Sequence, residues 1–403
     1  MEDEPIFVNL LLKTWTSDIG GIYDYSTKSV ITIKDIIAES TYVVRNKDNN
    51  IENISQHSDI PSESDLLFHV LTDIDNKYSL YNPIPKHLKF NKENLNYLNN
   101  KIWYVIKPDN AKEDDNCNEE YSLSENDIIK FGKVKFAVQK IHFENENYEP
   151  ASPINNSKKY SVSELNKKCP PVFDYEFIVD TDKISNKEIC SFCKSQYYKN
   201  NEESETDAGD SDTLIYLCDC ENKLYFHLEC FRKKLYRNGV VKFDKQNDKS
   251  ITIKKFQCSN CKKQYPTKYK FKNKEKEKEI NYVLEEYKEP TNGDYMILES
   301  LDYMSDEQYC KSIHIVKLNT DYIKIGRESD NDICEKDISI SRCHAIFLYN
   351  KNEGKIYLQN KSSKFGTSVL VKKEINLLNK KIYLQVGRTY IEAYKGIKEK
   401  EKY

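Results

Sequence analysis

The chain has 403 residues, of which 38% are hydrophobic and 32% are charged, with a formal net charge of −3. This profile is typical of two or three soluble modules joined by polar linkers, and a charge so close to neutral gives no electrostatic basis for binding nucleic acid. No run of eighteen apolar residues is present, so we predict no membrane span. The acidic N-terminus has no apolar core of signal-peptide length, which predicts a protein of the cytoplasm or nucleus.

Residues 1–150 are predicted to form a β-rich domain. Runs rich in β-branched and aromatic residues occur at 29–33 and 102–106, with long polar inserts between them. The stretch 122–138 is a polar turn leading into alternating apolar residues, and it resembles the closing strands of a forkhead-associated (FHA) domain. Because no Gly-Arg or Ser-x-x-His motif precedes it, we expect such a domain to be degenerate and not to bind phosphate. A plain β-rich domain is the alternative.

Two polar stretches, 151–186 and 269–294, are predicted to be linkers. The first contains three prolines. The second begins in a run of charged residues, 268–279, which predicts a solvated linker or a short exposed helix, with a basic contact patch as the alternative.

Between these linkers, residues 187–268 hold eight candidate metal ligands in four close pairs. A two-residue gap lets one tight turn present two thiolates about 4 Å apart, as metal–sulfur bonds of about 2.3 Å require. In a reducing compartment, such a cysteine framework predicts metal binding and not disulfides. We therefore predict two zinc ions per chain. The ligands are Cys190, Cys193, Cys218, Cys220, His227, Cys230, Cys258 and Cys261.

The sequence around these ligands resembles a RING-variant (RING-CH) zinc finger. A single residue separates Cys218 from Cys220, and the runs 214–220 and 225–231 carry the RING-CH pattern. A PHD finger is the alternative, but it usually has a Trp where Phe256 stands. The resemblance implies two interleaved sites, with Cys190, Cys193, His227 and Cys230 on one ion and Cys218, Cys220, Cys258 and Cys261 on the other.

The same resemblance implies a RING-type ubiquitin ligase. Such a ligase has no catalytic nucleophile, because it holds a loaded ubiquitin-conjugating enzyme in position for attack by a substrate lysine. All eight ligand positions are filled by protein, so zinc-dependent hydrolysis is not expected. The contact with the conjugating enzyme is expected at Phe192 and on the helix after the sixth ligand, where Lys234 stands in place of a Trp.

Residues 295–397 have an apolar periodicity of two in short segments, which predicts an all-β sandwich of about 100 residues. Three motifs, at 326–333, 337–345 and 360–367, resemble in order and spacing those of the FHA domain. The chain is therefore predicted to be a mainly β multidomain protein, with an N-terminal β-rich domain, a central cross-braced RING-CH zinc finger and a C-terminal FHA β-sandwich.

The FHA resemblance implies a phosphothreonine site on the loops of this sandwich. A phosphothreonine carries close to two negative charges and three acceptor oxygens, so its site needs a guanidinium and a hydroxyl or amide donor. The family pattern places Arg327 and Ser341 on the phosphate, with Arg342 and Lys364 beside it. The loop-shaping residues are Gly326, His344 and Gly366. The predicted phosphopeptide site also includes Phe365, which stands where the family pattern has an Asn that holds the bound peptide, so peptide preference cannot be carried over.

Two functions follow from these modules. The first is a ubiquitin ligase that recruits phosphothreonine-containing proteins through its FHA domain, with a ubiquitin-conjugating enzyme as second partner. The second is a non-catalytic phosphopeptide-binding scaffold with a structural zinc finger, which Lys234 favours because buried aromatic residues usually dominate such interfaces. A PHD-like reader of histone tails is a third option.

Overall fold

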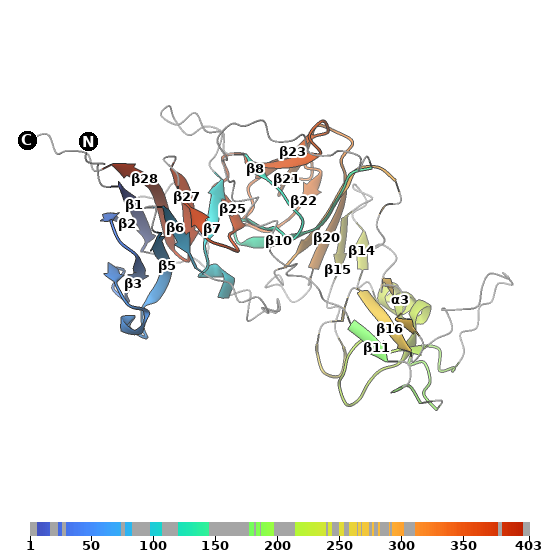
Figure 1. Cartoon of the computed structure of the whole chain (residues 1–403). Coiled ribbons are helices and arrows are strands. Elements are labelled where there is room, and N and C mark those ends of the chain that lie inside the picture. The colour runs from blue at the N-terminus through green and yellow to red at the C-terminus, as the bar shows by residue number, and fades with distance from the viewer. Residues whose placement is uncertain are drawn as a thin grey trace, which may run out of the picture. The chain divides into compact units, whose positions relative to one another are not determined.

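A computed structural model describes residues 6–16, 23–25, 30–73, 77–82, 97–106, 120–144, 177–180, 183–185, 187–196, 214–238, 241–243, 250–253, 258–263, 265–266, 268–273, 276–277, 281–282, 290, 292–301, 311–377 and 381–397. The fold is mainly β, as the sequence predicts. The chain divides into two compact units (Figure 1). The first consists of residues 1–172, 293–302 and 316–403, and the second of residues 173–292 and 303–315.

One long antiparallel sheet runs through the first unit, in the order β19-β10-β9-β25-β7-β27-β28-β1-β2. Strands from the N-terminal and C-terminal parts of the chain are interleaved in this sheet, and Figure 1 shows blue β1 beside red β28. The strands are β1 (Ile6–Trp15), β2 (Val30–Ile37), β7 (Trp103–Ile106), β9 (Ile128–Phe131), β10 (Val134–His142), β19 (Tyr295–Ser300), β25 (Thr367–Leu370), β27 (Ile382–Val386) and β28 (Thr389–Ile397).

Two shorter sheets complete the first unit. One has the order β26-β6-β5-β3-β4, with the 3-10 helix η1 (His57–Asp59) before β5, and the other has the order β22-β21-β23-β24-β8. The strands of the first are β3 (Thr41–Arg45), β4 (Ile51–Ile54), β5 (Asp65–Thr72), β6 (Tyr78–Tyr81) and β26 (Ile375–Asn376). Those of the second are β8 (Tyr121–Ser122), β21 (Tyr322–Gly326), β22 (Ile333–Cys334), β23 (Ala345–Asn350) and β24 (Lys355–Asn360).

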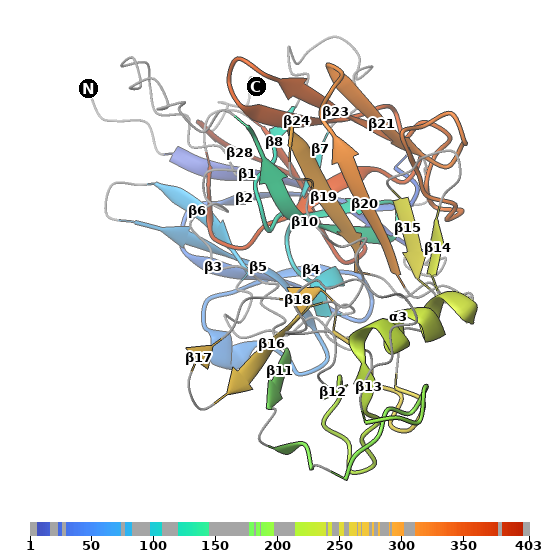
Figure 2. The same ribbon diagram turned by 90° about the vertical axis from the view of Figure 1, so that its right-hand side faces the viewer.

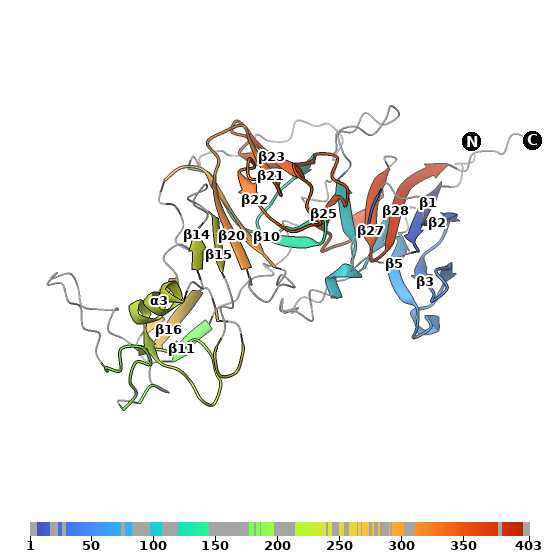
Figure 3. The ribbon, with the colours of Figure 1, turned by 180° about the vertical axis from the view of Figure 1, so that it is seen from behind.

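Each short sheet packs on one half of the long sheet, so the first unit contains two β-sandwiches with separate cores (Figure 3). Buried and less buried residues alternate along the strands and so produce these cores. In β24, Ile356 and Leu358 are buried, whereas Tyr357 between them is half-buried. We call the sandwich with β3–β6 the N-sandwich; its core includes Val43, Phe68 and Leu384. We call the sandwich with β21–β24 the C-sandwich.

The two sandwiches exchange their closing strands. The N-sandwich, built mostly from residues before 107, takes β26, β27 and β28 from the C-terminal end. The C-sandwich, built mostly from residues after 294, takes β8, β9 and β10 from residues 121–142. The sequence predicts separate modules at 1–150 and 295–397, whereas the strands of these segments are hydrogen-bonded to one another in both sandwiches.

The second unit contains the predicted metal ligands. Its one described α-helix is α3 (Leu228–Arg237), which follows the short antiparallel pair β12 (Leu214–Ile215) and β13 (Phe226–His227) (Figure 2). Phe231 of α3 packs against Phe226 and Tyr265, with ring centroids 5.0 Å and 5.1 Å away. β14 (Val241–Phe243) pairs antiparallel with β15 (Ser250–Ile253), and β15 pairs antiparallel with β20 (Lys311–Lys317).

A further sheet of the second unit lies where linkers are predicted. β11 (Phe177–Asp180) pairs in parallel with β16 (Lys268–Asn273), which also pairs with β17 (Lys276–Glu277) and β18 (Asn281–Tyr282) (Figures 1 and 2). The run after residue 267 is therefore a strand and not the linker or exposed helix that its charge predicts. The reason is the period-two spacing of Tyr269 and Phe271 within the lysines, and Tyr269 is only 2% exposed.

Candidate functional site

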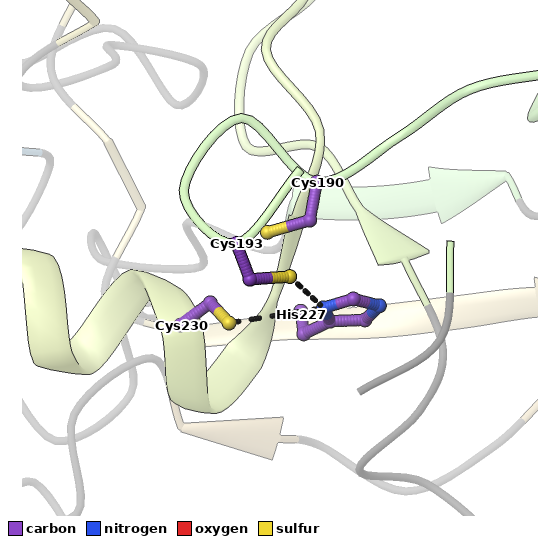
Figure 4. A group of neighbouring side chains, drawn as sticks. All are labelled: Cys190, Cys193, His227 and Cys230. Atoms are coloured by element: carbon purple, nitrogen blue, oxygen red, sulfur yellow. Dashed lines mark hydrogen bonds between the residues drawn. The ribbon is translucent and has the colours of Figure 1, made fainter. Parts of the chain in front are cut away.

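The first group of predicted ligands converges at one point of the second unit (Figure 4). Cys190 and Cys193 lie in one loop, and His227 and Cys230 stand where β13 passes into α3. Nδ1 of His227 lies 3.5 Å from Sγ of Cys193 and 3.8 Å from Sγ of Cys230. The four ligand atoms all lie within 4.8 Å of one another.

The orientation of the His227 ring suits a metal ligand. Its Nε2 lies 3.1 Å from the backbone carbonyl oxygen of Gln196. Because a carbonyl oxygen only accepts, Nε2 must carry the ring proton and donate it. Nδ1 then presents a lone pair toward the thiols, which is the state in which an imidazole binds a metal ion.

The second group consists of Cys218, Cys220, Cys258 and Cys261. Sγ of Cys218 lies 3.3 Å from that of Cys220 and 3.4 Å from that of Cys258. Burial alone would raise the pKa of Cys258, but hydrogen bonds, chiefly from backbone N–H groups of Cys261 and Asn260, lower that pKa to about 6. Burial raises the pKa of Cys218. Four thiols so close together cannot all ionise unless a cation compensates their mutual repulsion.

Both groups pass a geometric test for a metal ion. A tetrahedral ion with metal–sulfur bonds of about 2.3 Å holds its ligand atoms about 3.8 Å apart. The measured separations between ligand atoms are 3.3, 3.4, 3.5 and 3.8 Å. The two groups could therefore each hold a metal ion, and their membership is the interleaved one that the RING-CH resemblance implies.

The first and the last cysteine pair in the sequence, Cys190 with Cys193 and Cys258 with Cys261, lie in two similar turns. The backbone N–H of Lys194 donates to the carbonyl of Cys190 at 2.9 Å, and that of Lys262 donates to the carbonyl of Cys258 at 3.0 Å. Both lysines have a left-handed backbone, with φ of 60° and 61°. A lysine rarely adopts this conformation. In both turns the residue directly after the second cysteine of the pair thus has the left-handed conformation.

The predicted contacts for a conjugating enzyme lie beside α3. Phe192 is half-buried, and the guanidinium carbon of Arg237 stands 5.4 Å from its ring centroid. The ammonium of Lys234 stands 4.9 Å from the ring centroid of Phe226. Phe192 and the end of α3 thus share one surface of the unit.

The predicted phosphate-binding residues line one depression of about 360 Å³ on the C-sandwich. The three loops that form it follow β21, β22 and β24. The depression is lined by Arg327, Ile338, Ser339, Ile340, Ser341, Arg342, Cys343, Lys364 and Phe365. All five residues assigned to phosphopeptide binding from the sequence therefore lie together.

Gly326 lets the first loop approach the second. A Cβ at this position would collide with the carbonyl oxygen of Arg342. The backbone N–H of Arg327 donates to the carbonyl of Ser341 at 3.0 Å. The side-chain amide of Asn331 donates to the carbonyls of Glu328 and Arg342, both at 2.8 Å. These bonds fix the position from which the Arg327 side chain extends.

His344 braces the loops from inside the sandwich. It is fully buried; its Nδ1 accepts the backbone N–H of Ser341 at 2.9 Å, and its Nε2 donates to the carbonyl of Gly366 at 3.0 Å. Burial lowers the pKa of His344 from 6.5 to about 4. The ring is therefore neutral near pH 7, and its two nitrogens have opposite hydrogen-bonding roles.

The third loop is organised by Asn360, which is only 3% exposed. Its Oδ1 accepts from the hydroxyl of Ser363 at 2.7 Å and from that of Thr367 at 3.2 Å. Its amide donates to the carbonyl of Ile106, in a strand of the N-terminal half. The backbone N–H of Lys364 then lies 3.2 Å from the hydroxyl oxygen of Ser341 and joins the third loop to the second.

The cations of the depression differ in their partners. Nε of Arg342 lies 3.5 Å from a carboxylate oxygen of Glu328, and Nζ of Lys364 lies 3.3 Å from one of Asp24. The exposed guanidinium of Arg327 makes no ion pair with the residues that the structure describes. Arg327 is thus the cation most available to an incoming phosphate.

The N-sandwich has an arginine at the end of one of its strands. Arg45, the last residue of β3, stands opposite Asp65, the first residue of β5. The guanidinium of Arg45 pairs with Asp65 at 2.5 Å and donates to the hydroxyl of Thr389 at 2.8 Å. The Arg45 guanidinium is therefore engaged by side chains of the N-sandwich.

Several residues of the site are not predicted from the sequence. Asn331 lies inside the first FHA-like motif and could have been singled out there. Asn360 begins the third motif, but only its buried contact with Ile106 reveals its role. Asp24 is distant in sequence and carries no local signal.

Comparison with protein families matches residues 323–389 to the FHA domain. This match confirms the FHA prediction for that segment and implies phosphopeptide binding. The whole chain matches no curated protein. No helix in the described part of the chain has the length and hydropathy to cross a membrane.

Proposed function

We propose that this chain, whose residues 323–389 match the FHA domain, reads phosphothreonine-containing proteins through the depression on its C-sandwich. The observation that carries the proposal is the convergence of Arg327, Ser341 and Lys364 from three loops on one depression. Arg327 supplies a guanidinium for charge-assisted bonds to the phosphoryl oxygens, and Ser341 supplies a hydroxyl. The buried His344 and Asn360 keep these donors in place before the ligand arrives.

A phosphothreonine peptide array tests this proposal. Each charge-assisted hydrogen bond contributes roughly 1.5–3 kcal/mol, so Arg327→Ala should weaken binding about ten- to hundredfold. Lys355→Ala is the matched control, because Lys355 begins β24 and does not line the depression. Equal signals for wild type and Arg327→Ala would refute the phosphate assignment.

We further propose that the two cysteine-rich groups each hold a structural zinc ion. A ligand set of thiolates with one imidazole suits zinc, and each group provides four ligands, so that none of the coordination positions is left for water. The bound ions would supply folding energy of about 10–16 kcal/mol each, as in small fingers. Native mass spectrometry should find two metal ions per chain, whereas one or none would contradict the proposal.

For the second unit, we propose a RING-type ubiquitin ligase of the cytoplasm or nucleus. The supporting observation is that half-buried Phe192 lies beside the end of α3, where the resemblance places the contact with a conjugating enzyme. The alternative is a non-catalytic scaffold, and Lys234 supports it because no aromatic anchor stands at that position.

An autoubiquitination assay with a broad panel of conjugating enzymes separates these two functions. The ligase predicts activity in wild type that Phe192→Ala lowers while the metal content and the melting temperature stay unchanged. Lys187→Ala, at an exposed position of the same unit, is the control. No activity with any conjugating enzyme would favour the scaffold.

A further inference from the structure

A short segment of the N-terminal half, Tyr23-Asp24-Tyr25, lies against the third loop of the phosphate depression. The backbone N–H of Tyr25 donates to the carbonyl of Lys364 at 3.4 Å. The Tyr25 ring covers Gly366 so closely that a Cβ there would lie 2.5 Å from it. Gly366 also has φ of +74°, so both backbone and space require glycine at this position.

This segment is itself firmly anchored. The Tyr25 hydroxyl donates to Oε1 of Gln385 at 2.5 Å, and burial raises the pKa of that hydroxyl. The Tyr25 ring also packs edge-on against Trp15 and Tyr390, with centroids 5.3 Å and 5.7 Å away. The indole N–H of Trp15 donates to the carbonyl of Asp24 at 2.9 Å. Asp24 is therefore held beside Lys364 by strands of the N-sandwich.

The Asp24 carboxylate makes an ion pair with Lys364, which lines the depression. Its Oδ2 lies 3.3 Å from Nζ of Lys364, and the Asp24 side chain is 28% exposed while that of Lys364 is 61% exposed. The ammonium of Lys364 also lies 5.2 Å from the ring centroid of Phe365. A phosphoryl group in the depression would meet a lysine that is already paired and a carboxylate of its own sign.

We propose that Asp24 is an acidic gate that lowers the affinity of the depression for phosphopeptides. This inference rests on the proposed function and deepens it by adding a specificity-determining residue from the N-terminal half. Asp24 competes with the phosphoryl group for Lys364 and repels it directly. A ligand therefore needs the full charge of a phosphate to bind, and Tyr25 is the positioning residue that keeps the carboxylate there.

The test measures the affinity of the full chain for the best peptide selected from a degenerate phosphothreonine library. Since exposed ion pairs have small energies, Asp24→Asn should tighten binding roughly twofold to fivefold at low salt. Asp24→Ser should do the same, and Asp24→Glu should keep the wild-type affinity because the charge remains. At about 1 M salt, where the Debye length is about 3 Å, the gain should shrink.

A double-mutant cycle then shows whether Asp24 acts through Lys364. Lys364→Gln should weaken binding, and in that background Asp24→Asn should give a clearly smaller gain. Melting temperatures identify any variant that fails to fold, and a folded Asp24→Ser can replace a misfolded Asp24→Asn. The proposed role of Asp24 is wrong if folded Asp24→Asn and Asp24→Ser bind the peptide no more tightly than wild type. It is also wrong if Asp24→Asn raises the affinity equally in the Lys364→Gln background.

The binding data distinguish a wrong role for Asp24 from a wrong assignment of phosphopeptide binding. If wild type binds no phosphopeptide, or if Arg327→Ala binds as well as wild type, the proposed function itself fails. If Arg327→Ala weakens binding as predicted while Asp24→Asn leaves the affinity unchanged, only the proposed role of Asp24 is wrong.

Discussion

His344 donates a hydrogen bond from Nε2 to the carbonyl of Gly366 at 3.0 Å and thereby joins the second phosphate loop to the third. The same carbonyl accepts the backbone N–H of Gly132 at 3.1 Å. One buried imidazole and one turn from the N-terminal half thus determine where Lys364 and Phe365 stand.

This arrangement predicts a loss of stability in mild acid. Burial lowers the pKa of His344 from 6.5 to about 4, so the unfolded chain binds the proton more readily than the folded one. The stabilisation of the folded state by the neutral His344 ring is complete above pH 6.5 and is lost as the pH falls toward 4. At about 1.4 kcal/mol per pKa unit it amounts to roughly 3 kcal/mol. Denaturant unfolding between pH 7 and pH 4 measures it.

The control for this prediction is a variant without the titrating ring. His344→Asn should be less stable than wild type at neutral pH, but its stability should depend less steeply on pH. If the free energy of unfolding depends equally on pH in the two proteins, His344 does not contribute to the loss of stability in acid.

Gly326→Ala should damage both folding and binding. The added Cβ would collide with the carbonyl oxygen of Arg342 and separate the first two loops, at a cost of about 1–3 kcal/mol. Gly293→Ala is the matched control, because a Cβ there meets nothing within 4 Å although its φ is +83°. We expect weaker phosphopeptide binding for Gly326→Ala alone, measured by fluorescence anisotropy. Equal affinities of the two variants would contradict the assigned loop contact.

Loss of one metal ligand should affect both metal sites. Cys230 lies in the first group, but its helix follows the segment that carries Cys218 and Cys220 of the second group. Cys230→Ala should therefore lose more than one metal ion per chain, because the apo segment unfolds. Cys343→Ala, outside both groups, should retain the wild-type metal content. A Cys230→Ala protein with one tightly bound metal ion would show that the two sites form independently.

The strand exchange predicts that neither half of the first unit folds alone. A fragment 290–403 lacks β8, β9 and β10, and a fragment 1–150 lacks β26, β27 and β28. When produced together, the two fragments should associate and give the β-sheet circular dichroism that each lacks alone. A folded, phosphopeptide-binding 290–403 fragment would contradict this prediction.

The sequence predicts the chemistry of both sites because their residues lie in short motifs. Cys190 and Cys193 share one turn, and Arg327 follows Gly326 directly, so local spacing identifies them. The mainly β character also follows from local alternation, as in β24.

Strand partners could not be predicted in the same way. Alternation along β1 shows which residues are buried but not that Val8 pairs with Lys395 of β28. For the same reason, the contact of Asp24 with Lys364 has no signature in the sequence. The strand at Tyr269 was missed because lysines surround it and hide a period of two.

The reciprocal exchange of closing strands also constrains the order of events during synthesis. Thr14 of β1 and its partner Thr389 of β28 are 375 residues apart in the chain. During synthesis, the edge of β1 that pairs with β28 must therefore stay unpaired until the residues between them have been made, a state that is prone to aggregation. A truncation before β28 would leave the edges of β1 and β27 unpaired and would remove Tyr390, which packs against Tyr25 beside the third phosphate loop.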